Sequence, residues 1–106
     1  MTDRELLEMA AKAAGLELVL WQPDGSPHAI YQNDTVSWRW NPLADDGDAL
    51  RLAVKLGICI YPPFPAIDGN LAIAHTKHMT EERCGHDAYS STRRAIVRAA
   101  ATGGRN

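Results

Sequence analysis

The stretch WRWNPLADDGDALRLAVKLG, residues 38–57, decides how this chain folds. It holds two of the three tryptophans, an Asn-Pro corner, a cluster of aspartates and a well-formed amphipathic helix pattern. Because the residue after Asn41 is proline, helical geometry is disfavoured there, and an extended segment must end and turn. A helix then begins at Asp45 or Asp46, since either aspartate can cap the free backbone N–H groups of a first helical turn. Gly57 ends that helix.

The apolar residues on both sides of the corner are expected to pack together. In the helix they recur at helical spacing and form one stripe. The stripe consists of Ala49, Leu52, Ala53 and Leu56, with Leu50 and Val54 beside it. In the extended segment Val36, Trp38 and Trp40 share one face, because side chains alternate along a strand. Residues 38–57 are therefore interpreted as a structural hinge between a strand and a helix.

The rest of the chain reads as further helices and strands. Thr2 and Glu5 fit the capping-box pattern at the start of the first helix. The Pro62-Pro63 pair is expected to cut a strand short, and the polar residues 76–86 are predicted to form a loop. In chain order the predicted elements are a helix over 3–14, strands over 16–21, 28–32 and 35–40, the helix after 45, strands over 58–61 and 71–75, and a helix from 87 that Gly103-Gly104 ends.

This order, α-β-β-(β)-α-β-β-α, predicts an α+β fold. The 106 residues are expected to form a single domain, with residues 103–106 as a disordered tail. We expect an antiparallel sheet of hairpins whose apolar face is covered by the second and third helices, with the first helix packed nearby. The predicted core is Val36, Trp38, Trp40, Leu50, Leu52, Ala53, Leu56, Ile58, Ile60, Leu71, Ile73, Ala95, Ile96 and Ala99.

Charge is distributed unevenly along the chain, although the net charge is only −2. Residues 1–50 contain nine Asp or Glu against three Lys or Arg, and residues 51–106 contain four against eight. Such asymmetry serves a partner surface in some proteins and lets two halves of one domain neutralise each other in others. We favour mutual neutralisation.

The sequence predicts a cytoplasmic protein that does not enter a membrane. Its first residues are polar and acidic, unlike a signal peptide, and no apolar run approaches the roughly 20 residues that a bilayer requires. The two cysteines, Cys59 and Cys84, do not make a disulfide framework and are expected to be reduced. Cys59 lies in an apolar strand pattern and is predicted to be a buried thiol.

A cluster of metal-ligating residue types runs through His75, His78, Cys84 and His86. Histidine and cysteine are zinc ligands, but this spacing is not a usual structural-zinc pattern. On an extended strand His75 and His78 would also point to opposite faces. We favour a polar loop without metal and keep the metal site as an alternative.

A nucleic-acid surface is a second alternative, built from Trp38 and Trp40 with Arg93, Arg94 and Arg98 of the last helix. Aromatic rings stack on bases and arginines meet phosphates. The two tryptophans share a strand face with an apolar neighbour, however, which is typical of a core. The net negative charge also weakens long-range attraction to nucleic acid. Core packing is the favoured interpretation.

Catalytic patterns are not evident in the sequence. Ser90 and Ser91 lie at the start of the last predicted helix without a nucleophile elbow around them, and no phosphate-binding glycine loop is present. Helix capping accounts for Asp45, Asp46 and Asp48. We therefore predict a protein that is not an enzyme and needs no cofactor.

Three segments carry a resemblance: TDRELLEMAAKAAGLE at the start, WNPLADDGDALRLAVKLGI at 40–58 and HDAYSSTRRAIVRAAA at 86–101. They resemble small proteins encoded by bacteriophages and prophages of proteobacteria, and the arrangement is loosely similar to the NinX-like phage family. Residues 21–36 and 60–85 lie outside the resemblance. It implies a shared fold and a phage origin, and it transfers no active site.

The leading functional hypothesis is a non-enzymatic phage or prophage accessory protein that binds a host or phage protein in the bacterial cytoplasm. The alternatives are the nucleic-acid-associated factor and the small metal-binding protein described above. The sequence does not predict an oligomeric state.

Overall fold

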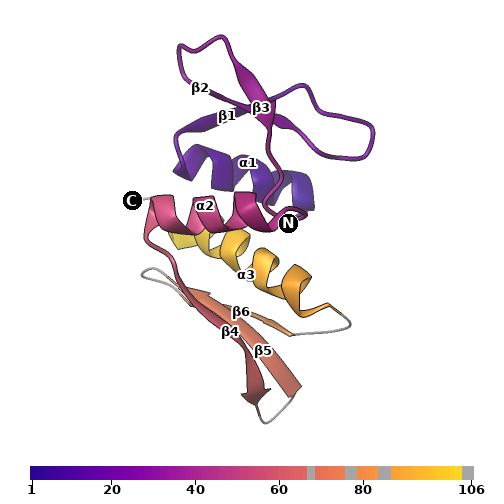
Figure 1. The fold of residues 1–106 in the computed structure, drawn as a ribbon, viewed down its shortest axis with the longest axis vertical. Coiled ribbons are helices and arrows are strands. Elements are labelled where there is room, and N and C mark those ends of the chain that lie inside the picture. The colour runs from indigo at the N-terminus through magenta and orange to yellow at the C-terminus, as the bar shows by residue number, and fades with distance from the viewer. Residues whose placement is uncertain (67–68, 76–78, 84–86, 104–106) are drawn as a thin grey trace.

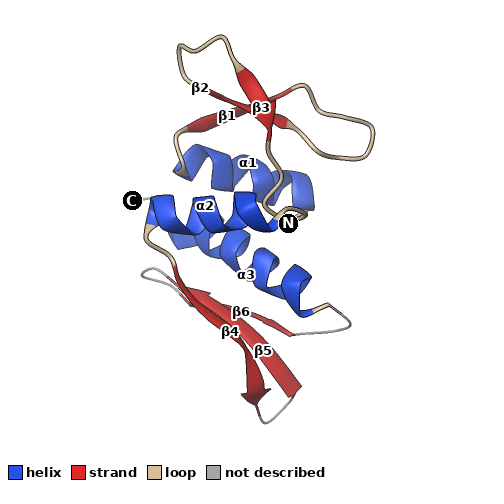
Figure 2. Cartoon of the chain, in the orientation of Figure 1, coloured by secondary structure: helices blue, strands red, loops and turns tan. Residues whose placement is uncertain are grey.

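The computed structural model describes residues 1–66, 69–75, 79–83 and 87–103 and has the predicted α+β fold. Along the chain, single helices alternate with groups of consecutive strands (Figure 2). The elements are α1 (Asp3–Ala13), β1 (Leu16–Val19), β2 (His28–Tyr31), β3 (Ser37–Arg39), α2 (Asp46–Leu56), β4 (Cys59–Ala66), β5 (Gly69–His75), β6 (Met79–Arg83) and α3 (Ala88–Gly103). Gly103 thus belongs to α3, and the rest of the predicted tail lies outside the described residues.

The strands form two antiparallel sheets, which corrects the prediction of one. Their orders are β1-β2-β3 and β4-β5-β6, and the helices lie between them (Figure 1). β1 contacts α1, whereas all three strands of the second sheet contact α3. Each sheet therefore buries its apolar face on a different helix, and α2 intervenes in the chain between them.

The polar segment predicted as a loop contains β6. This strand pairs antiparallel with β5, in a register that sets Ala72 opposite Glu82. Strand prediction relies on apolar residues alternating with polar ones. In β6 the position facing α3 is held by Glu82, which forms ion pairs with Arg94 and Arg98. Because a charged residue occupies the inward position, the sequence shows no apolar alternation there.

β4 continues through the proline-rich stretch at which it was predicted to end. Its pairing with β5 shifts register between Tyr61 and Phe64, where the two prolines stand. β4 lies at the edge of its sheet, and an edge strand tolerates proline because an outward-facing backbone position needs no N–H donor. The strand therefore continues through the prolines, with a shift of register instead of an end.

The predicted helix caps at Thr2 and Asp45 are confirmed, whereas the carboxylates of Asp46 and Asp48, which capping was also expected to explain, bind Arg93 and the Asn41 N–H. Thr2 and Glu5 form a capping box at the start of α1. At α2 the Asp45 carboxylate accepts a hydrogen bond from the Asp48 backbone N–H (2.8 Å), and Gly57 ends the helix with φ of +66°. Asp48 itself is buried and accepts from the Asn41 N–H (2.9 Å). The corner before α2 is thus hydrogen-bonded to the first turn of the helix.

The core centres on α3, which contacts α1, α2 and the second sheet. Its buried face is largely alanine, and small side chains let neighbouring backbones approach closely. Of the predicted core, Trp40, Leu52, Ala53, Ile58, Ala95, Ile96 and Ala99 are buried, and Trp38, Leu56, Ile60, Leu71 and Ile73 are partly buried.

Two predicted core residues, Val36 and Leu50, are 66% and 59% exposed. Val36 precedes the first residue of β3, so it does not belong to the paired part of the sheet. Leu50 lies on a side of α2 that other elements leave accessible. Both predictions were therefore wrong, because periodicity does not say which side of an element is covered.

Candidate functional site

The arginines of α3 bind carboxylates of their own chain. Arg93 has a side chain only 15% exposed; its Nη1 donates to Asp46 of α2 (2.6 Å), and its Nε donates to the carbonyl oxygen of Leu43 (3.0 Å). Arg94 pairs with Asp3 of α1 (2.8 Å), and Arg98 pairs with Glu82. These side chains therefore tie α3 to the elements around it.

Two of these ion pairs join the basic half of the chain to the acidic half. Asp3 and Asp46 lie in the first half, and Arg93 and Arg94 in the second. The predicted mutual neutralisation is confirmed for these pairs. The carboxylates already occupy the guanidinium groups that a nucleic-acid surface would need.

The tryptophans lie apart from these arginines. Trp40 is 5% exposed, and its backbone N–H donates to the Pro27 carbonyl oxygen (3.1 Å). Trp38 is partly buried, with its ring centroid 5.1 Å from that of Tyr31. The cations that share a hollow with both tryptophans are Arg51 and Lys55 of α2. The structure thus does not assemble the predicted interaction residues into one surface.

The predicted metal cluster cannot be placed, because His78, Cys84 and His86 lie outside the described residues, as does the side chain of His75. Within the described part of the chain, no group of three or more His, Cys, Asp or Glu side chains is placed to hold a metal ion. Cys59 is an exposed free thiol, contrary to the prediction of burial. Cys59 is the first residue of β4, and its neighbours Ile58 and Ile60 are buried and partly buried, so alternation turns Cys59 outward.

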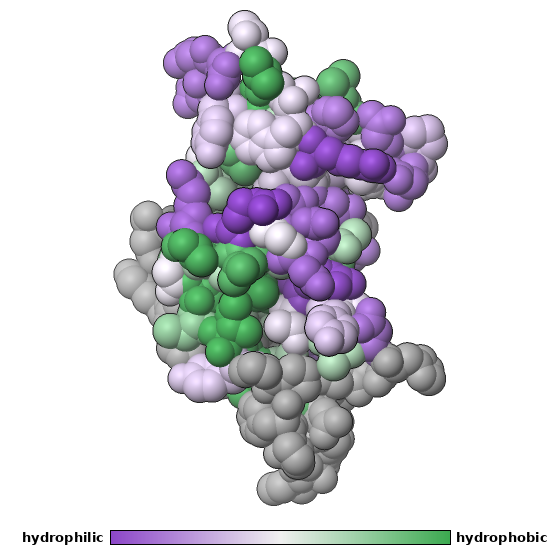
Figure 3. Space-filling model, in the orientation of Figure 1, coloured by the Kyte–Doolittle hydropathy of each residue, from purple (hydrophilic) through white to green (hydrophobic). Residues whose placement is uncertain are grey.

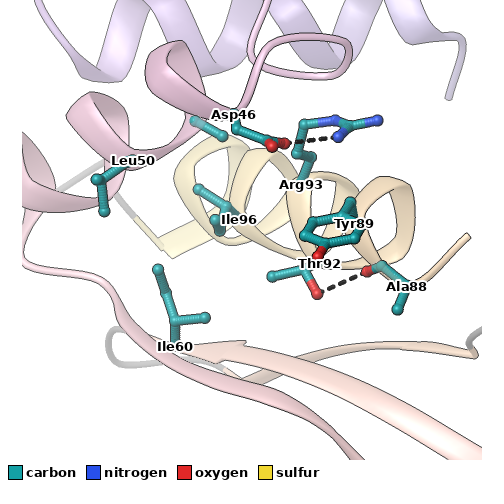
Figure 4. Close-up of a pocket in the computed structure, with 9 residues that line it drawn as sticks. Asp46, Leu50, Ile60, Ala88, Tyr89, Thr92, Arg93 and Ile96 are labelled. Atoms are coloured by element: carbon teal, nitrogen blue, oxygen red, sulfur yellow. Dashed lines mark hydrogen bonds and ion pairs between the residues drawn. The ribbon is translucent and has the colours of Figure 1, made fainter.

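An apolar groove of about 590 Å³ lies between α2, α3 and the start of β4. Leu50, Ile60 and Ile96 point from these three elements into the same space (Figure 4). The groove is lined by Asp46, Ala49, Leu50, Ile60, Ala88, Tyr89, Thr92, Arg93 and Ile96.

The charged groups in this lining and the Thr92 hydroxyl already have partners within the chain. Arg93 and Asp46 form their ion pair at one end, and the Thr92 hydroxyl donates to the Ala88 carbonyl oxygen (2.8 Å) (Figure 4). Asp87 is a second carboxylate near Arg93, at 3.9 Å. Because these hydrogen bonds are made internally, the groove offers mainly apolar contact, which suits binding better than acid–base chemistry.

An apolar ridge borders the groove. It consists of Leu50 and Val54, one helical turn apart on α2, and their exposed fractions are 59% and 74%. Tyr89 on α3 is 70% exposed and lines the same groove. Figure 3 shows a continuous apolar area between α2 and β4, whereas the apolar residues over the first sheet are scattered among hydrophilic ones.

The sequence contains a signal for this ridge. The apolar residues of α2 cover more of the helix than one stripe facing a core requires, because Leu50 and Val54 flank a stripe that is already complete. Surplus apolar positions of this kind indicate a second contact face.

Comparisons with known proteins returned no match among protein-family models, curated protein sequences or solved structures. Of the helices in the described part of the chain, none is long and apolar enough to cross a bilayer.

Proposed function

We propose that this protein is a non-enzymatic accessory protein that binds a segment of another protein in the groove between α2, α3 and β4. The observation that carries the proposal is the apolar groove beside the exposed ridge of Leu50 and Val54. The nearby charged groups are satisfied internally, so the free energy of binding would come from burying apolar surface.

The size of that contribution supports the proposal. Fully burying an exposed leucine or valine side chain is worth about 1.5–3 kcal/mol. Tyr89 lines the same groove with an exposed ring, and tyrosine is enriched among the anchors that dominate protein interfaces. Contiguous exposed apolar patches on soluble proteins often mark such sites.

The resemblance to phage and prophage proteins leads us to propose a phage origin and a partner from the phage or its bacterial host. Phage genes cluster by role, so the genes beside this one test that origin. A chromosomal setting without phage genes would contradict it.

A matched pair of variants tests the binding face. Val54→Asp places a charge on the ridge, and Val36→Asp places the same charge at a similarly exposed valine away from the groove; the two valines are 74% and 66% exposed. In pull-downs from a lysate of the bacterium that carries the gene, we expect a protein captured by wild type and by Val36→Asp but lost with Val54→Asp. Equal capture by all three proteins would contradict the proposed site.

The nucleic-acid alternative has less support. Arg93, Arg94 and Arg98 are paired with carboxylates, and Trp40 is buried. A nucleic-acid surface would have to break those pairs or use other cations. Salt-sensitive binding in a gel-shift assay would bring this alternative back.

A further inference from the structure

We propose that β6 is an exchangeable edge strand, and that an extended acidic segment of a partner protein takes its place on β5 and α3. β6 lies at one edge of the second sheet and β4 at the other, with β5 between them. The described lining of the apolar groove comes from α2, α3 and β4. The inference therefore concerns a second site and does not rest on the proposed function.

The apolar face of the second sheet ends before β6. Ala74 of β5 pairs with Ile60 of β4 on one side and with Thr80 of β6 on the other. Ala72, the next position of β5 on this face, pairs with Glu82. Both alanines are fully buried, and Ile60 packs against the core. Where β4 has an apolar residue on this face, β6 therefore has a threonine and a glutamate.

Glu82 links β6 to α3 through charge. Its carboxylate pairs with Arg98 and lies 3.7 Å from Nε of Arg94. The Glu82 side chain is 20% exposed, and those of Arg94 and Arg98 are 37% and 41% exposed. Ion pairs with this much exposure hold two elements less firmly than buried apolar contacts do, because water and salt compete for the charges. An edge strand held in this way is expected to open before the rest of its sheet.

Opening of β6 uncovers a surface that suits one kind of partner. The edge of β5 then presents backbone N–H and C=O groups, to which an extended segment can add as a strand. Arg94 and Arg98 lose Glu82 at the same moment, and a carboxylate of the added segment can replace it. β6 itself shows how such a segment binds, because it makes both the strand pairing and the ion pairs.

Hydrogen–deuterium exchange of the full chain, measured by mass spectrometry, tests the opening of β6. In wild type, about 1 M salt should speed the exchange of residues 79–83 relative to that of β2, the central strand of the first sheet. Glu82→Ala should speed it by roughly fivefold or more, because both ion pairs are lost. The matched control Glu81→Ala should not, since Glu81 pairs with Ile73 and its position belongs to the other face of the sheet.

A peptide with the sequence of β6, MTEER, tests the assigned partner. We add it in millimolar excess to the Glu82→Ala protein, whose own strand is weakened, and expect slower exchange along β5. The same peptide with the Glu82→Ala change should protect β5 much less. Adding Val54→Asp to the protein should leave the protection unchanged, because Val54 borders the groove and not this edge.

The inference is overturned if Glu81→Ala and Glu82→Ala speed the exchange of residues 79–83 equally, or if salt leaves the wild-type exchange unchanged. It is also overturned if the two peptides protect β5 alike or not at all. Glu82→Gln, which keeps the size of the side chain and removes its charge, replaces Glu82→Ala if that protein does not fold. Failure here leaves the proposed function standing, since capture through the groove depends on Val54 and not on Glu82.

Discussion

The helices α1 and α2 share one local pattern and differ in what covers them. Each has eleven residues and a side-chain N-cap, and each is followed closely by a glycine with positive φ, Gly15 or Gly57. The fifth and ninth helical positions are Leu7 and Ala11 in α1 and Leu50 and Val54 in α2. In α1 these residues are 2% and 1% exposed; in α2 they are 59% and 74% exposed.

The difference follows from where each helix lies. α1 contacts both β1 and α3, so elements of the chain cover it from more than one side (Figure 1). α2 packs on α3 and leaves its outer side accessible. Apolar residues at equivalent positions thus belong to the core in one helix and to the exposed surface in the other. Apolar periodicity therefore identifies a helix face that is suited to burial. Whether that face is buried depends on which other elements pack against it.

The largest expected effect is on the free energy of unfolding when the two equivalent leucines are replaced by alanine. Leu7→Ala should lower the free energy of unfolding by about 2–5 kcal/mol, because it empties a fully enclosed site. Leu50→Ala should change it by less than about 0.5 kcal/mol, since the side chain is mostly exposed. Urea denaturation of monomeric protein at low concentration measures both values. Equal losses would show that Leu50 is enclosed in solution.

An intermediate effect on the free energy of unfolding is expected when the arginines that link α3 to the other two helices by ion pairs are replaced. Arg93 holds Asp46 of α2 and is 15% exposed, whereas Arg94 holds Asp3 of α1 and is 37% exposed. Arg93→Met should cost about 1–3 kcal/mol, because it leaves the Leu43 carbonyl oxygen without this donor as well. Arg94→Met should cost at most about 1 kcal/mol, as is usual for an exposed pair. The same denaturation experiment separates them, and a larger loss for Arg94→Met would contradict this order.

The smallest effect concerns the reciprocal capping box, which α1 has and α2 does not. Hydrogen bonds from the Thr2 backbone N–H and hydroxyl hold the pKa of Glu5 below its ordinary value. Stability from a lowered carboxyl pKa is present above the ordinary pKa and is lost as the pH falls through the folded-state pKa. Glu5→Gln should therefore lower the Tm slightly at pH 7 and leave it nearly unchanged near pH 2.5. A larger loss at the acidic pH would contradict the capping role.

Local chemistry allowed much of the fold to be predicted. The caps at Thr2 and Asp45, the stop at Gly57 and the corner at Asn41 depend on a few neighbouring residues, and all occur as predicted. β6 was missed because its inward position is held by Glu82, whose partners lie on α3. The groove was missed because its lining comes from α2, β4 and α3, which are separated in the sequence.

The sequence by itself determined where helices begin and end, which residues are apolar and that the two halves of the chain carry opposite charge. Those properties depend on backbone geometry, side-chain type and composition. The tertiary structure alone decided that the strands divide into two sheets, that the α3 arginines meet acids of α1 and α2, and that Leu7 is enclosed while Leu50 is not. These outcomes depend on which elements lie next to each other, because burial and ion pairing are properties of neighbours in space.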